Sequence, residues 1–232
     1  MDTTWFNGDQ SMEGAKEDSA TPRVSGCSTA SQGSKRDWRD IRRAILDRVA
    51  IHPCTAAHFT DLFASTSAAY RSVARLRKRG KIRPVGTVML KDSGRPLVVY
   101  CNTWQPKDLR HEVLLTDFLL LYPQAIVRRG YAVDETIRPD AELTFGSRRL
   151  LVELDTGEMT HRQVQQRWSV YRGVEDLLLV VTCSPTRLEN LRRTCEAVAN
   201  IALFTTLDQA KPSPFGEIWI DHFGNKAALP SG

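Results

Sequence analysis

The stretch 138–158, RPDAELTFGSRRLLVELDTGE, places four carboxylates around two short apolar runs: Asp140, Glu153, Asp155 and Glu158. A carboxylate beside a buried strand costs free energy unless a partner compensates its charge. Glu153 and Asp155 are two residues apart, so on a strand they point to the same face of the sheet. The turn FGSR lets the two apolar runs pair as a hairpin, which brings Asp140 near Glu153 or Asp155.

Carboxylate oxygens from such a hairpin can hold Mg²⁺ or Mn²⁺, because these hard cations prefer oxygen ligands. We therefore predict that Asp140, Glu153 and Asp155 converge as metal ligands in one cleft near the sheet edge, and that Glu158 adds a further acid. Without metal, repulsion between the acids is expected to shift their pKa values.

The segments around this hairpin predict an α/β layer arrangement with a mixed sheet. The sequence DLRHEVLLTDFLLLYP predicts a helix, followed by a strand that ends near Ile126 and Val127. A helix is expected from about Thr160 to Tyr171, and then a buried strand, LLLVVT. A helix after Pro185 and two strands, IALFTT and EIWID, complete the pattern.

The segment before the hairpin has the order of a winged helix. An amphipathic helix begins at Asp37, a short second helix is AAHFTDLF, and the third is AAYRSVARLRKRGK, with Tyr70, Val73 and Leu76 expected to face inward. The runs KIRPVGTVML and PLVVYC flank the turn KDSGR, which predicts a β-hairpin.

Positive charge is concentrated in this segment, which favours DNA binding. Residues 34–110 carry 17 Lys and Arg against 6 Asp and Glu, whereas residues 111–232 carry 13 against 16. The third helix is predicted to contact phosphates or guanine edges in the major groove. The predicted DNA-binding residues are Ser67, Arg71, Arg75, Lys78 and Arg79. A basic surface or a protein-binding role are the alternatives.

Composition predicts a folded, soluble protein of two domains: the 232 residues are 41% hydrophobic and 25% charged. We expect a disordered tail over 1–34, a winged-helix domain over 35–104 and an α/β domain over 107–225. The five scattered cysteines argue against disulfides or a zinc site. The apolar runs are too short to span a bilayer, so no membrane insertion and a cytoplasmic location are expected.

The pattern PD, then ExD inside a sheet, then a helix, resembles the PD-(D/E)xK nuclease superfamily. This resemblance implies a restriction-endonuclease-like fold and makes Asp140 and Glu153 metal ligands. Asp155 stands where that superfamily has lysine, and no lysine occurs from Asp108 to Ala210. Arginine cannot act as a base near neutral pH, so Arg162 or Arg167 could only stabilise phosphate charge. Catalysis would then depend on a carboxylate-rich site, with one or two metals.

The whole arrangement, with RHEVLLTDF, RPDAEL, LLVELDTGE and LLLVVTCSPTRL, is similar to the replication-relaxation family, which includes mobilisation relaxases of the MOBC class. The resemblance covers residues 37–221. It implies metal-dependent nicking of supercoiled plasmid DNA at a transfer origin, with relaxosome accessory and coupling proteins as partners. The alternative is a non-catalytic DNA-binding regulator of plasmid replication, built on a degenerate nuclease fold.

Two further residues near the acids have ordinary structural interpretations as well as catalytic ones. His161 could transfer a proton, but a histidine at the start of a helix is the simpler interpretation. Tyr171 could be a covalent nucleophile, but an aromatic residue at the end of an amphipathic helix is more often part of the core.

Overall fold

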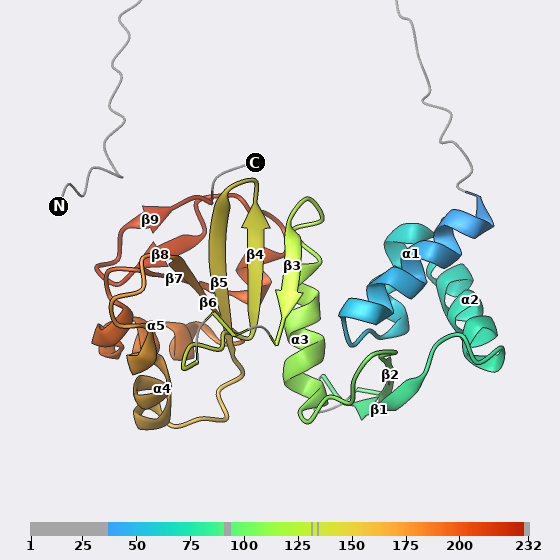
Figure 1. The fold of residues 1–232 in the computed structure, drawn as a ribbon, viewed down its shortest axis with the longest axis horizontal. Coiled ribbons are helices and arrows are strands. Elements are labelled where there is room, and N and C mark those ends of the chain that lie inside the picture. The colour runs from blue at the N-terminus through green and yellow to red at the C-terminus, as the bar shows by residue number, and fades with distance from the viewer. Residues whose placement is uncertain (1–36, 91–93, 131, 134, 230–232) are drawn as a thin grey trace, which may run out of the picture. The chain divides into compact units, whose positions relative to one another are not determined.

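The computed structural model describes residues 37–90, 94–130, 132–133 and 135–229, and it has an α/β fold (Figure 1). Residues from Arg36 onward belong to one compact unit. The predicted tail over 1–34 and the residues 91–93 of the predicted hairpin turn lie outside the described residues. The prediction of an α/β chain with a mixed sheet is confirmed.

A seven-stranded mixed sheet forms the larger part of the fold, in the order β3-β4-β5-β6-β7-β8-β9. Its parallel centre is β5-β6-β7, and the other neighbouring strands pair antiparallel. The first strand begins, rather than ends, at Ile126. The strands are β3 (Ile126–Arg129), β4 (Ala141–Phe145), β5 (Arg148–Asp155), β6 (Leu177–Thr182), β7 (Ala202–Thr206), β8 (Trp219–Asp221) and β9 (Lys226–Ala227).

Strand β5 separates two hydrophobic clusters, one on each face of the sheet. Leu150, Val152 and Leu154 pack in a cluster with residues of α3 (Leu109–Leu119) and α6 (Leu207–Ala210). Leu151 packs in the other cluster, with α4 (His161–Trp168), η2 (Ser169–Tyr171) and α5 (Pro185–Thr194). The short η3 (Glu196–Val198) completes that layer.

This alternation turns Glu153 and Asp155 toward the α4 and α5 layer, as their spacing predicted. Both carboxylates are buried at the end of β5.

The N-terminal module, residues 37–101, has its own hydrophobic core. Its elements are α1 (Trp38–Ile51), η1 (Ala56–Leu62), α2 (Thr66–Lys78), β1 (Pro84–Val88) and β2 (Leu97–Tyr100). Asp37 and Ser65 cap α1 and α2 by accepting hydrogen bonds from backbone N–H groups. Val73 and Leu76 are buried as predicted, and β1 and β2 form an antiparallel hairpin.

The short second helix is present as a 3₁₀ helix, η1, but one prediction for this module is wrong. Tyr70 is 45% exposed rather than inward-facing. Ala69, four residues before Val73, is buried instead. Tyr70 consequently lies beside the exposed basic residues of α2.

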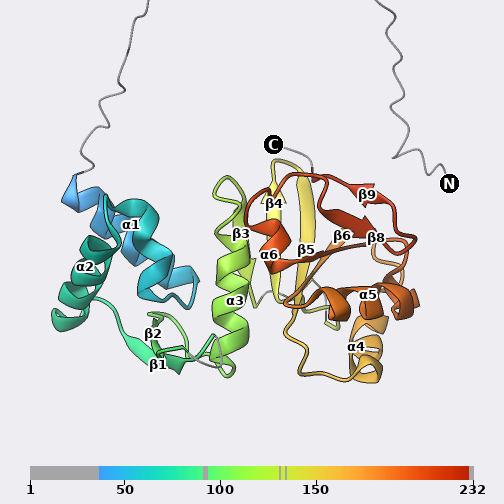
Figure 2. The ribbon, with the colours of Figure 1, turned by 180° about the vertical axis from the view of Figure 1, so that it is seen from behind.

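Helix α3 follows the β1-β2 hairpin along the chain (Figure 2), and polar contacts connect this helix to the N-terminal module. His58 Nε2 lies 2.6 Å from Asp117 Oδ1, and Thr116 Oγ1 donates a hydrogen bond to the Pro53 carbonyl oxygen at 3.0 Å. A small apolar cluster of hairpin residues with α3 adds to this junction.

At the same junction His52 Nδ1 lies 3.2 Å from the Arg129 guanidinium. Burial, followed by the charge of Arg129, lowers the pKa of His52 to about 3. His52 is therefore neutral in the folded protein but takes up a proton below about pH 6.5 when unfolded. We expect the contribution of His52 to the free energy of unfolding to fall by about 1.4 kcal/mol per pH unit from about pH 6 downward.

Urea denaturation of the wild type and of His52→Asn between pH 4 and pH 8 measures this effect. Asparagine does not titrate, so the variant is expected to lose stability less steeply below pH 6. Equal slopes for the two proteins would show that His52 does not couple folding to pH.

In the part of the chain that the structure describes, no helix combines the length and the apolar character needed to cross a membrane.

Candidate functional site

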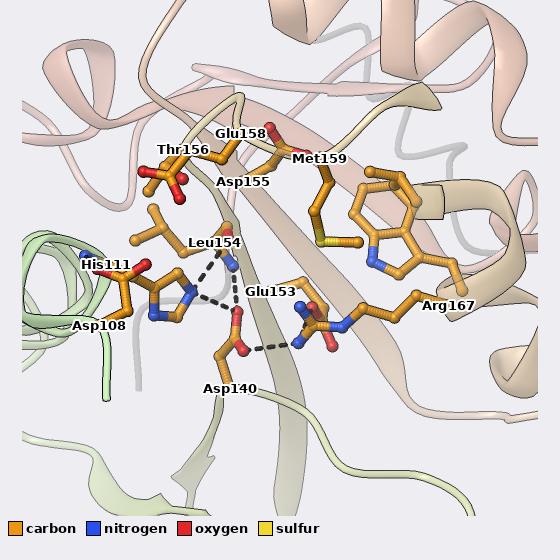
Figure 3. Close-up of a pocket in the computed structure, with 12 residues that line it drawn as sticks. Asp108, His111, Asp140, Glu153, Leu154, Asp155, Thr156, Glu158, Met159 and Arg167 are labelled. Atoms are coloured by element: carbon orange, nitrogen blue, oxygen red, sulfur yellow. Dashed lines mark hydrogen bonds and ion pairs between the residues drawn. The ribbon is translucent and has the colours of Figure 1, made fainter. Parts of the chain in front are cut away.

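The predicted acids line one pocket of about 280 Å³ at the end of β5 (Figure 3). Asp140 immediately precedes β4, and it approaches β5 because β4 and β5 pair in the predicted hairpin. From the α4 side the pocket is lined by Arg167. The predicted residues that line it are Asp140, Glu153, Asp155, Glu158 and Arg167.

Asp140 is held by donors from three elements. Its Oδ2 accepts a hydrogen bond from the Leu154 backbone N–H at 2.8 Å and lies 3.1 Å from His111 Nε2. Its Oδ1 accepts a hydrogen bond from Arg167 Nη2 at 2.7 Å. Burial by itself would raise the pKa of Asp140, but the hydrogen bond and charge of His111 and the charge of Arg167 outweigh burial and lower it. Asp140 is therefore ionised.

Glu153 is among the most buried charged side chains of the sheet, at 1% exposure. Its Oε1 accepts a hydrogen bond from the Tyr171 hydroxyl at 2.6 Å, and its Oε2 lies 2.9 Å from Arg167 Nη2. Burial, with a smaller contribution from the charge of Asp140, raises the pKa of Glu153 to about 8. The predicted repulsion between the acids thus operates, but burial is the larger cause.

Arg167 compensates both carboxylates. Its Nη2 nitrogen lies within hydrogen-bond distance of Asp140 Oδ1 and of Glu153 Oε2. A protein cation thereby supplies the compensation for which the sequence predicted a metal ion.

His111 is a pocket residue that contacts Asp140 and that sequence reasoning missed. It lies on the first turn of α3, where its Nε2 is close to both Asp140 Oδ2 and the Leu154 carbonyl oxygen, at 3.1 and 3.2 Å. Burial opposes its charged form, but hydrogen bonds with Asp140 and Glu112 prevail and raise the pKa of His111 to about 10. The available signal was the polar pair His111–Glu112 on the first turn of an amphipathic helix, α3.

Asp155 lines the pocket, but its carboxylate is engaged elsewhere. Arg187 of α5 forms two hydrogen bonds with it, Nε to Oδ1 at 2.9 Å and Nη2 to Oδ2 at 2.8 Å. The Gly157 backbone N–H also donates to Oδ1, at 2.8 Å. The structure therefore brings Asp140 and Glu153 together through Arg167, whereas Asp155 pairs with Arg187, a partner that sequence reasoning also missed.

The remaining candidates lie at the margin of the pocket or outside it. Glu158 is exposed at the rim, and its Oε1 is 3.6 Å from Arg110 Nη1. Arg162 and His161 do not line the pocket. Tyr171 is buried in the hydrophobic cluster of α4 and α5, as its core interpretation predicted, and burial raises the pKa of its hydroxyl.

A divalent cation is compatible with part of the predicted ligand set. Within the described ranges no three His, Cys, Asp or Glu side chains are grouped to hold a metal ion. The chemistry of two donors nevertheless suits Mg²⁺ or Mn²⁺, since Asp140 and Glu153 offer hard oxygen atoms on either side of one nitrogen, Arg167 Nη2. Arg167 would have to move for these two carboxylates to share a metal ion.

The predicted DNA-binding residues form an exposed surface on α2. All five side chains point away from the buried face of the helix, and Arg79 caps its end. We call this surface the basic face; it comprises Ser67, Arg71, Arg75, Lys78 and Arg79.

Comparisons of the sequence with protein-family models and with curated proteins, and of the structure with solved structures, found no match.

Proposed function

We propose that this protein is a metal-dependent DNA-nicking enzyme, in which Asp140 and Glu153 hold Mg²⁺ or Mn²⁺. One observation carries the proposal: the carboxylates of Asp140, just before β4, and of the buried Glu153 on β5 meet at a pocket, with oxygens 2.7 and 2.9 Å from the same cationic nitrogen. Acids whose pKa values are perturbed by burial and by a specific charged partner, and which lie in a cleft, are candidates for a functional site.

The proposal also includes a fold for each of the two parts of the chain. The three helices and antiparallel hairpin of the N-terminal module support a winged helix. The mixed sheet with helices on both faces supports a restriction-endonuclease-like domain. In this proposal the basic face of α2 binds the phosphates of double-stranded DNA, and the α/β domain cuts one strand.

The residues of the pocket have different roles in this proposal. A bound divalent cation supplies Lewis acidity and an activated water at neutral pH. Asp140 and Glu153 would hold this cation, and His111 fixes the orientation of Asp140 through Nε2. Arg167, released from the carboxylates, turns its guanidinium to the phosphate oxygens, where a planar donor pair suits an anion.

Nicking at a plasmid transfer origin, with relaxosome accessory and coupling proteins as partners, is the specific form of this activity that we propose. Its support is the resemblance of RPDAEL and LLVELDTGE, together with the preceding module, to mobilisation relaxases of the MOBC class.

A second function is favoured by a specific observation. Arg167 already compensates Asp140 and Glu153, and Arg187 compensates Asp155, so the acids are paired without any metal. This pairing supports a non-catalytic DNA-binding regulator of plasmid replication, in which the acids and arginines only stabilise the fold.

Incubation of the protein with supercoiled plasmid, with and without Mg²⁺ or Mn²⁺, distinguishes the two functions. The proposed enzyme converts supercoiled DNA to open circles only with metal, and end mapping then locates the cut. DNA binding without nicking, on a plasmid that carries the cognate origin, would establish the regulator instead.

A separate prediction concerns the basic face. Arg75→Ala combined with Arg79→Ala is expected to weaken duplex binding by about 10-fold at 100 mM salt, because two phosphate contacts are lost. The slope of log affinity against log salt should also fall by about 2. Fluorescence anisotropy at several salt concentrations measures both quantities.

The matched control for this prediction is Arg39→Ala combined with Arg43→Ala, which removes the same charge from exposed positions of α1. An unchanged salt slope in the α2 variant, or an equal decrease in the α1 variant, would exclude the basic face as the specific DNA-binding surface.

A further inference from the structure

A second pocket, of about 600 Å³, adjoins the first, and Asp140 lines both. Its volume falls within the range of roughly 300–1,000 Å³ that is usual for small-ligand sites. The side chains that matter here are Trp104, from the segment after β2, Arg129, from the end of β3, and Arg138, just before Asp140. None of these three side chains lines the first pocket.

Three hydrogen bonds hold the segment that carries Trp104. Arg83 Nη2 donates a hydrogen bond to the Trp104 carbonyl oxygen at 2.9 Å, and Thr103 Oγ1 donates one to the Ala50 carbonyl oxygen at 2.7 Å. Gln105 Nε2 donates to the backbone of β1 at 2.9 Å. The half-buried indole is thus presented at the pocket from a fixed backbone, and these contacts do not depend on the indole itself.

The two arginines of this pocket differ in whether an acidic side chain neutralises their charge. Arg129 lies with its guanidinium 6.0 Å from the Trp104 ring centroid, is buried, and pairs with Glu112. Arg138 is exposed and makes neither a hydrogen bond nor an ion pair with the described residues. The pocket therefore combines an aromatic face with one uncompensated cation, separated from Asp140 only by Pro139.

We propose that the second pocket holds an unpaired nucleotide of the DNA strand, with its base against the Trp104 indole and a phosphate at Arg138. This inference rests on the proposed DNA function. Aromatic side chains bind the faces of unstacked bases, which a duplex does not offer, and arginine binds the phosphate. Because Asp140 lines both pockets, the unpaired nucleotide lies next to the proposed site of cleavage.

Binding of a labelled single strand of about 12 nucleotides, and of the matching duplex, tests the proposal in EDTA, where no metal-dependent cleavage occurs. Trp104→Ala is expected to weaken single-strand binding by about 10-fold and duplex binding by less than about 2-fold, whereas Trp104→Tyr retains a stacking ring and most of the affinity. Arg138→Ala should weaken single-strand binding and lower its salt dependence. Arg172→Ala, at an exposed arginine outside both pockets, is the matched control.

Unchanged single-strand binding in Trp104→Ala, or equal losses for single strand and duplex, would overturn the proposal. Displacement of the single strand by millimolar dAMP with wild-type protein, but not with Trp104→Ala, would support a base site. If dAMP binding depended on Trp104 but oligonucleotide binding did not, the pocket would be a site for a free nucleotide. That result would overturn the proposal. Trp104-dependent binding of single strands by a protein that never nicks would refute the proposed enzyme and leave this inference intact.

Discussion

Asp140→Asn is expected to reduce metal-dependent nicking by more than about 100-fold. Loss of an outer-shell partner alone costs a metal site up to about 100-fold, and loss of a direct ligand should cost more. The amide cannot supply the negative charge that a divalent cation requires, although it keeps nearly the same shape. Glu153→Gln should have a similar effect, because the proposed site has only these two carboxylates. Initial rates of open-circle formation over a range of Mg²⁺ concentrations measure the loss.

The control is Asp47→Asn, the same chemical change at an exposed helix position that pairs with Arg43 at 3.8 Å. It should nick at the wild-type rate. Affinity for duplex DNA in EDTA should stay unchanged in all three variants, since the basic face is on the N-terminal module. Full nicking by Asp140→Asn with its stability intact would exclude Asp140 from the metal site and with it the proposed mechanism.

Asp155→Ala is expected to lower the free energy of unfolding by about 3 kcal/mol. The Asp155 and Arg187 side chains are 5% and 14% exposed, and loss of one partner leaves the other as a buried charge without compensation. Asp155→Lys should be worse, because it places a second cation beside Arg187 rather than restoring a nuclease lysine. Urea denaturation with an unchanged m-value measures both effects.

Asp47→Ala is again the matched control, because its ion pair is exposed and its loss should cost less than about 0.5 kcal/mol. Asp155→Leu combined with Arg187→Leu removes both charges and should recover part of the stability lost in Asp155→Ala. If Asp155→Ala instead abolished nicking without altering the free energy of unfolding, Asp155 would be a metal ligand, as the sequence pattern predicted.

Local pattern predicted much of the fold because periodicity is a property of neighbouring residues. The two-residue spacing of Glu153 and Asp155 placed both on one face of β5, and the apolar runs identified the strands of the mixed sheet except β9. The same reasoning failed at Tyr70, where the neighbouring residue Ala69 is buried instead. Helical periodicity defines a buried stripe but does not decide between adjacent residues at its edge.

Which cation compensates which acid was decided only by the tertiary structure. Asp140 meets His111 and Arg167 across 29 and 27 residues of sequence, and Asp155 meets Arg187 across 32. These contacts depend on how α3, α4 and α5 pack on the two faces of the sheet, which no local spacing encodes. The sequence by itself determined that buried carboxylates at the end of β5 need compensation, because an uncompensated charge there is too costly. Only packing across the sheet determined that arginine and histidine, placed on helices distant in sequence, provide it.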